Sequence, residues 1–199
     1  MEKEIDKEEL SKLIKMNGEV RGVALKSHAD FILQQKGQIE LDKLENILVE
    51  LGYPIKFKEI KTWDFYPIGI EIIEMLTIKN LFNFEDKKFE EIGTFGSVSS
   101  FIMKLFMRYF GSIKMVAKEA PSIWKKYYTI GELKVKELNE KERYIILDVE
   151  NFFIHPLHCF HLKGFFSSVV QMVTKTNPSC EETKCVHRGD SFHEFVIKW

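Results

Sequence analysis

The sequence has few of the features that mark secreted, membrane or nucleic-acid-binding proteins. Only three of its 199 residues are cysteine, which is too few and an odd number for a disulfide framework. No apolar run approaches the roughly 18–20 residues of a membrane helix, and the opening stretch MEKEIDKEEL lacks the apolar centre of a signal peptide. The net charge of −1 gives no general attraction to nucleic acid or anionic lipid. We therefore expect a cytoplasmic protein that binds neither.

Apolar residues are plentiful, at 45% of the chain, and 17 residues are phenylalanine. This composition indicates a large aromatic core or an apolar pocket. Helical periodicity runs through the first two thirds of the chain, where Gly93 and Gly96 predict a turn and Pro121 predicts the start of a short helix. Two predicted hairpins, at 131–150 and 180–199, then flank one further helix.

The order of these elements predicts the fold class. N-terminal helices followed by strand–strand–helix–strand–strand indicate an α+β fold with an antiparallel sheet. The chain shows no repeat and no linker, so we expect a single domain over residues 1–199, with residues 1–18 as a short helical appendage.

Cysteine and histidine concentrate near the C-terminus. All three cysteines and five of the six histidines lie between His155 and His193, in the stretches HPLHCFH and CEETKCVHRGDSFHEF. Zinc prefers four tetrahedral ligands of these types. Cys185 and His193 stand about four residues on either side of the predicted turn, so on paired strands they lie opposite each other and within reach of one ion. His187 shares the face of Cys185 by strand alternation and is the nearest rival ligand.

The ending ETKCVHRGDSFHEFVI resembles the C-terminal signature of 4-vinyl reductase (4VR) domains, a family of small-molecule binding and sensor domains. The resemblance implies a zinc site of Cys159, Glu182, Cys185 and His193, in which histidine replaces a cysteine of the family pattern. Strand alternation alone would put Glu182 and Cys185 on opposite faces, so this ligand set also predicts a bulge in the strand. Cys180 or His161 could take the place of Glu182.

The earlier stretches VRGVALKSHADFI, GYP and WDFYP are similar to the start of heme NO-binding (H-NOX) domains, whose superfamily includes subunits of the TRAPP trafficking complex. That resemblance implies helices and a sheet that enclose an apolar cavity. H-NOX domains bind heme iron through a histidine on a helix near mid-chain, and SFIMKLFMRYFGSIKMVAKE contains none. The Tyr-x-Ser-x-Arg motif for the heme propionates is also missing. We therefore do not expect heme.

The sequence thus favours a non-enzymatic domain that binds or senses a hydrophobic or aromatic ligand and carries a structural zinc ion. The alternatives are a heme NO-binding-like gas sensor, a zinc-dependent enzyme, and an assembly scaffold of TRAPP type. With no output segment attached, signalling would pass through a homodimer or a partner protein. The candidate ligand-binding residues are aromatic: Phe101, Phe106, Tyr109, Phe110, Trp63 and Trp124.

Overall fold

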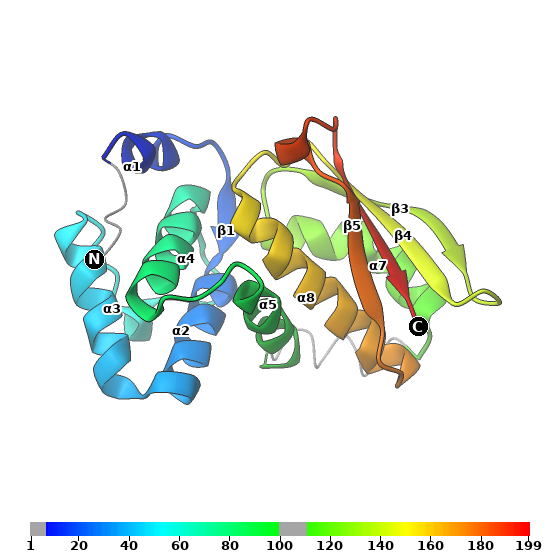
Figure 1. The fold of residues 1–199 in the computed structure, drawn as a ribbon, viewed down its shortest axis with the longest axis horizontal. Helices are drawn as coiled ribbons and strands as arrows, with labels where there is room; N and C mark the ends of the chain where they lie inside the picture. Colours follow the sequence, from blue (N-terminus) through cyan, green and yellow to red (C-terminus); the bar gives the residue numbers. More distant parts are fainter. Residues whose placement is uncertain (1–6, 100–110) are drawn as a thin grey trace.

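A computed structural model describes residues 7–99 and 111–199 of the chain (Figure 1). The helices of these residues are α1 (Lys7–Ile14), α2 (Gly22–Lys36), α3 (Gln38–Glu50), α4 (Ile68–Phe82), α5 (Lys88–Ser99), α7 (Ile113–Tyr127) and α8 (Pro156–Thr174), with the 3-10 turns η1 (Phe57–Glu59) and η2 (Val186–Arg188). The strands are β1 (Glu19–Arg21), β2 (Phe65–Pro67), β3 (Glu132–Asn139), β4 (Tyr144–Glu150), β5 (Ser179–Lys184) and β6 (His193–Lys198).

The main sheet has four antiparallel strands in the order β3-β4-β6-β5. Helix α8 connects β4 to β5, so the chain runs strand–strand–helix–strand–strand as the sequence predicts. The predicted α+β fold is therefore confirmed. The inner face of the sheet is apolar because Ile145, Leu147 and Val149 alternate along β4 and are all buried.

Helix α8 lies along the sheet and separates it from the N-terminal helices (Figure 1). It begins where His155 accepts a hydrogen bond from the Leu157 N–H at 3.1 Å, with Pro156 in the first turn. It ends at Lys175, which adopts a left-handed conformation. The cysteine and the histidines of HPLHCFH are thereby held on a rigid helix between the sheet and the rest of the protein.

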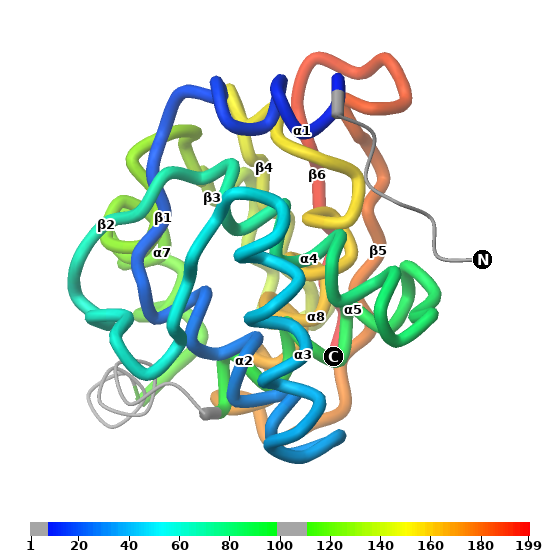
Figure 2. Tube along the Cα trace, turned by 90° about the vertical axis from the view of Figure 1, so that its left-hand side faces the viewer, coloured from blue at the N-terminus to red at the C-terminus, as the bar shows by residue number. Residues whose placement is uncertain are grey.

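The N-terminal helices form the other end of the molecule. Seen from that end, α2, α3 and α4 lie in front of α8 and the sheet (Figure 2). The two-stranded sheet β1–β2, which the sequence does not predict, ties the start of α2 to the start of α4. Helix α4 begins directly after Pro67 and is buried over most of its length.

Two details differ from the sequence prediction. Gly93 and Gly96 lie inside α5 and not in a turn. The glycine is needed for helix packing, because a Cβ atom at Gly93 would lie 2.0 Å from the His161 carbonyl oxygen of α8. Pro121 lies in the interior of α7, which begins after Ser112, whose hydroxyl accepts a hydrogen bond from the Met115 N–H at 3.3 Å. The capping serine, and not the proline, marks the start of this helix.

The apolar core is continuous from the helical end to the sheet and includes residues from every layer. Within the two described segments, no helix combines the length and the apolar character needed to cross a membrane.

Candidate functional site

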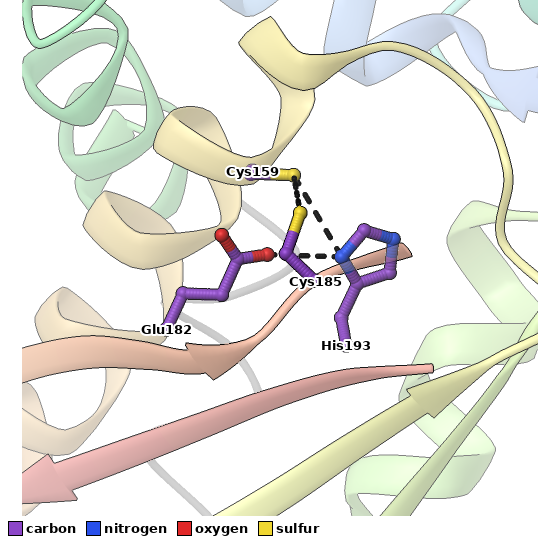
Figure 3. Close-up of side chains that lie close together, drawn as sticks. All are labelled: Cys159, Glu182, Cys185 and His193. Atoms are coloured by element: carbon purple, nitrogen blue, oxygen red, sulfur yellow. Dashed lines mark hydrogen bonds and ion pairs between the residues drawn. The ribbon is translucent and has the colours of Figure 1, made fainter. Parts of the chain in front are cut away.

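The structure brings together four side chains from two separate stretches of the sequence. Cys159 comes from α8, Glu182 from β5, Cys185 from the residue after β5, and His193 from the start of β6. One potential ligand atom from each lies within 4.8 Å of the others. The four side chains point toward a common centre (Figure 3). They are the four residues that the resemblance to 4-vinyl reductase domains implies.

The distances in this cluster suit a shared ion. Cys159 Sγ lies 3.8 Å from Cys185 Sγ and 3.7 Å from His193 Nδ1. Ligands at about 2.3 Å (sulfur) and about 2.0–2.1 Å (nitrogen) from one tetrahedral ion lie about 3.8 and 3.6 Å apart. His193 Nδ1 and Glu182 Oε1 are closer, at 2.9 Å. The carboxylate would therefore move outward by about 0.5 Å to reach a tetrahedral position.

The orientation of His193 also favours a cation in the cluster. Its Nε2–H donates to the Phe152 carbonyl oxygen at 3.0 Å, which leaves the lone pair of a neutral ring on Nδ1. That lone pair faces the carboxylate of Glu182, which is itself an acceptor. Two acceptors at this distance need a proton or a metal ion between them. Asp190 holds Cys185 in place by accepting its backbone N–H at 2.8 Å.

The electrostatics of the cluster follow from burial. Burial raises the pKa of the Cys159 thiol well above its ordinary value and raises the pKa of Cys185 as well. Burial alone would also raise the pKa of Glu182, but its interactions with the His193, Cys159 and Cys185 side chains outweigh burial and lower that pKa. Buried thiols become good ligands only when a cation stabilises their thiolates.

The predicted bulge is present in β5. The register changes between Glu182, which pairs with Phe195, and Lys184, which pairs with Glu194. The extra residue turns Glu182 toward the same centre as Cys185.

None of the three rival ligands joins the cluster. Cys180 is half-buried further back on β5. The ring of His187, in η2, lies 5.7 Å from the ring of His193. His161 is buried against α2 and lines a cavity instead.

That cavity lies between α2, α7, α8 and the sheet. The volume of this cavity is about 90 Å³. The whole space between the surrounding walls, including the part that opens to solvent, is about 940 Å³. The lining is almost entirely apolar and includes Val23, Ile113, Ala117, Leu147, Leu162 and Phe165. Among the described residues of the lining, His161 contributes the one imidazole.

Of the aromatic residues predicted to bind a ligand, Trp124 lines the cavity and Trp63 does not. Trp124 is 4% exposed and lines the cavity, while its indole N–H donates to the Ile130 and Gly131 carbonyl oxygens. Trp63 does not line the cavity; it is 61% exposed, in the turn before β2. Phe101, Phe106, Tyr109 and Phe110 lie outside the described residues.

A second set of buried polar residues was not predicted from the sequence. Glu71 and Glu74 of α4 are 0% exposed and face histidines from two other helices. His158 Nε2 lies 3.3 Å from Glu71, and His28 Nδ1 lies 3.5 Å from Glu74. The available signal was the pair of glutamates in the otherwise apolar stretch IGIEIIEMLTI, but their partners lie more than 40 residues away along the chain.

No protein-family model and no curated protein matches this sequence. Solved structures do match its fold. An H-NOX protein from S. oneidensis in the Fe(II)NO ligation state has a TM-score of 0.67 and 15% identity, over 89% of this chain and 98% of that one. The unliganded Fe(II) H-NOX protein from K. algicida has a TM-score of 0.61 and 14% identity, over 89% and 95%. A structure that addresses heme distortion in the H-NOX family has a TM-score of 0.62 and 14% identity, over 90% and 94%.

These similarities establish an H-NOX-like fold, and the resemblance to 4-vinyl reductase domains gains no support from them. They also contradict the cofactor prediction, which was zinc without heme. The H-NOX structures named above concern Fe(II) or heme, so they point to heme and not to zinc. The exclusion of heme rested on the lack of histidine in one mid-chain stretch and on the missing Tyr-x-Ser-x-Arg motif. The fold supplies an imidazole to the cavity from another helix, α8.

Proposed function

We propose that this chain is a non-enzymatic sensor domain that binds a hydrophobic ligand in the cavity between α2, α7, α8 and the sheet. The observation that carries the proposal is the cavity itself, with its apolar walls and the single imidazole of His161. Such a space costs packing energy when empty, because its lining atoms lose contacts. Ligand sites commonly combine apolar walls with a few polar groups in this way.

Heme is the first ligand to test, because the structural neighbours include H-NOX proteins with Fe(II) and heme. The apolar lining suits the faces of a porphyrin and includes Val23 of α2, Ile113 of α7, and Leu162 and Phe165 of α8. Heme would supply an iron centre able to bind a small gas molecule. Pockets for larger ligands usually have about 300–1,000 Å³. A porphyrin therefore requires α7 and α8 to separate.

A small apolar molecule is the second candidate, and the volume of the cavity favours it. An apolar cavity of about 150 Å³ binds benzene, and this one has about 90 Å³ as it stands. A ligand of five or six non-hydrogen atoms would need little rearrangement of the walls.

We further propose that Cys159, Glu182, Cys185 and His193 bind one metal ion with a structural role. The ion would fasten the β5–β6 hairpin to α8, the helix that also contributes Leu162 and Phe166 to the cavity. It would thus hold two walls of the cavity together when no ligand is present. The output of the sensor would pass through a second copy of the chain or a partner protein.

Titration with hemin tests the ligand proposal. Wild-type protein is expected to give a Soret band that saturates at one hemin per chain and to quench the fluorescence of Trp124. Ala117→Leu should abolish both signals, because Ala117 lines the cavity. Met115→Leu is the control, since Met115 lies on the same helix but is 45% exposed. Equal hemin binding by all three proteins would show that heme binds elsewhere.

Metal analysis of the purified protein tests the metal proposal. One equivalent of a divalent ion is expected in the wild type and in Cys180→Ser, whose cysteine lies outside the cluster. Cys185→Ser should lose most of that ion. Equal metal content in the two variants would refute the assignment of these ligands.

A further inference from the structure

Three buried side chains form a chain of contacts that ends at the cavity. Glu74 Oε2 of α4 lies 3.5 Å from Nδ1 of His28 on α2. The other nitrogen of His28, Nε2, lies 3.3 Å from Nε2 of His161 on α8. Glu74 and His28 are 0% exposed and His161 is 5% exposed. His161 lines the cavity, and its remaining nitrogen, Nδ1, is buried with no hydrogen-bond partner among the described residues.

Other ionisable groups surround this chain. Glu71 lies one turn before Glu74 on α4, and His158 lies one turn before His161 on α8. These two contact each other at 3.3 Å, and the Tyr128 hydroxyl lies 3.2 Å from the same nitrogen of His158. Glu71 and His158 thus partner each other, and the Tyr128 hydroxyl bonds to His158. His161, the last residue of the Glu74–His28–His161 chain, is one of the residues that line the cavity.

The number of protons on Glu74 and His28 decides what His161 can offer. If the two residues share one extra proton, it is either on the carboxyl group or on the imidazole. In both cases His28 carries hydrogen on Nε2 and donates it to Nε2 of His161. A neutral His161 must then carry its own hydrogen on Nδ1. If the extra proton is absent, His28 donates through Nδ1 to the carboxylate, and Nδ1 of His161 has a lone pair instead.

Burial favours the form with the extra proton. An unpaired carboxylate in an apolar interior is costly, and a second carboxylate, Glu71, lies close by. Burial, with a smaller contribution from Glu71, raises the pKa of Glu74 to about 7 despite the attraction of His28. Burial lowers the pKa of His28, but the charge and hydrogen bond of Glu74 outweigh it and raise that pKa overall.

We propose that Glu74 and His28 act as positioning residues that make His161 present an N–H donor to the cavity. This inference rests on the proposed function and narrows its ligand class. The cavity would select a compact apolar molecule with one hydrogen-bond acceptor, such as a carbonyl or ether oxygen, over a pure hydrocarbon. Among the described residues of the wall, the Ser27 hydroxyl donates to the Ala24 carbonyl oxygen, the Trp124 indole N–H donates to Ile130 and Gly131, and the Tyr128 hydroxyl lies 3.2 Å from His158 Nε2.

The first test reads the tautomer directly, without any ligand. Long-range ¹H–¹⁵N correlation spectra of the histidine rings at pH 6 should show His161 protonated at Nδ1. Glu74→Gln should keep this tautomer, because the glutamine amide can donate to His28 Nδ1 as a protonated glutamate does. Hydrogen on Nε2 of His161 in the wild-type protein would overturn the proposal.

The second test compares two probes of similar shape, tetrahydrofuran and cyclopentane, by NMR titration. Only the ether oxygen of tetrahydrofuran accepts a hydrogen bond. His161→Phe should weaken tetrahydrofuran binding about fivefold, the value of one ordinary hydrogen bond, and change cyclopentane binding less than twofold. An equal change for both probes would overturn the ligand class. If neither probe binds the wild type, the proposed cavity function fails with it, while the tautomer measurement still reports on the buried chain.

Discussion

Filling the cavity should stabilise the protein, although the same substitution elsewhere in the core should destabilise it. Ala117 of α7 lines the cavity and is 7% exposed, so a leucine there can extend into empty space. Ala29 of α2 is 1% exposed and belongs to the packed core, outside the cavity lining. The pair Ala117→Leu and Ala29→Leu therefore makes one chemical change in two different surroundings.

The magnitudes follow from burial and packing. Leucine adds three carbon atoms to alanine, and each buried methylene contributes about 0.8 kcal/mol. Ala117→Leu should thus raise the free energy of unfolding by about 2 kcal/mol if the cavity takes the whole side chain. Ala29→Leu has no space to use, and overpacking costs about 1–3 kcal/mol.

Guanidinium chloride unfolding of refolded, ligand-free protein measures both changes. Linear extrapolation to zero denaturant gives each free energy of unfolding. If the slope of this free energy against denaturant concentration is the same in all proteins, the values can be compared directly. A loss of stability of similar size in both variants would mean that no usable space exists beside Ala117. The cavity would then be a packed part of the core, and the ligand proposal would lose its basis.

Three further predictions concern other parts of the structure. Removal of the proposed metal ion by a chelator should lower the melting temperature of the wild type by about 10 °C, as expected for a loss of about 3–4 kcal/mol, and should leave the melting temperature of Cys185→Ser unchanged. Gly164→Ala should destabilise the fold by about 3 kcal/mol in the same denaturant assay, because its Cβ atom would lie 1.8 Å from the Glu90 carbonyl oxygen of α5. The raised pKa of Glu74, about 7 against 4.5, means that its contribution to stability is complete below pH 4.5 and is lost as the pH rises through 7. The stability of the wild type relative to Glu74→Gln should therefore fall by about 3 kcal/mol between pH 5 and pH 8; a constant difference would contradict the burial of an ionisable Glu74.

The C-terminal half of the fold was predictable because its signals are local. The turn at Gly189, the alternation in β4 and the periodicity of α8 each depend on neighbouring residues, and together they give the strand–strand–helix–strand–strand order. The bulge in β5 was also predictable, since a ligand set containing both Glu182 and Cys185 requires it.

The buried interior could not be predicted in the same way. His28, Glu74 and His161 come from three helices, and only their packing brings them into contact. The exclusion of heme failed for a related reason, because it considered two local sequence signals and not the whole cavity wall. Trp63 is a large aromatic residue of the kind that often lines a pocket. In the structure it lies at the surface, just before strand β2, which pairs with β1.

The most direct test of a ligand-binding cavity is the mass of the purified, intact protein under native conditions. Wild-type protein incubated with hemin, and separately with tetrahydrofuran, should show the added mass of one molecule in at least one case. Ala117→Leu should show none. The account is contradicted if the wild type shows no added mass of either probe beyond the polypeptide and the proposed metal ion. It is also contradicted if Ala117→Leu shows the same added mass as the wild type, because the cavity is then not the binding site.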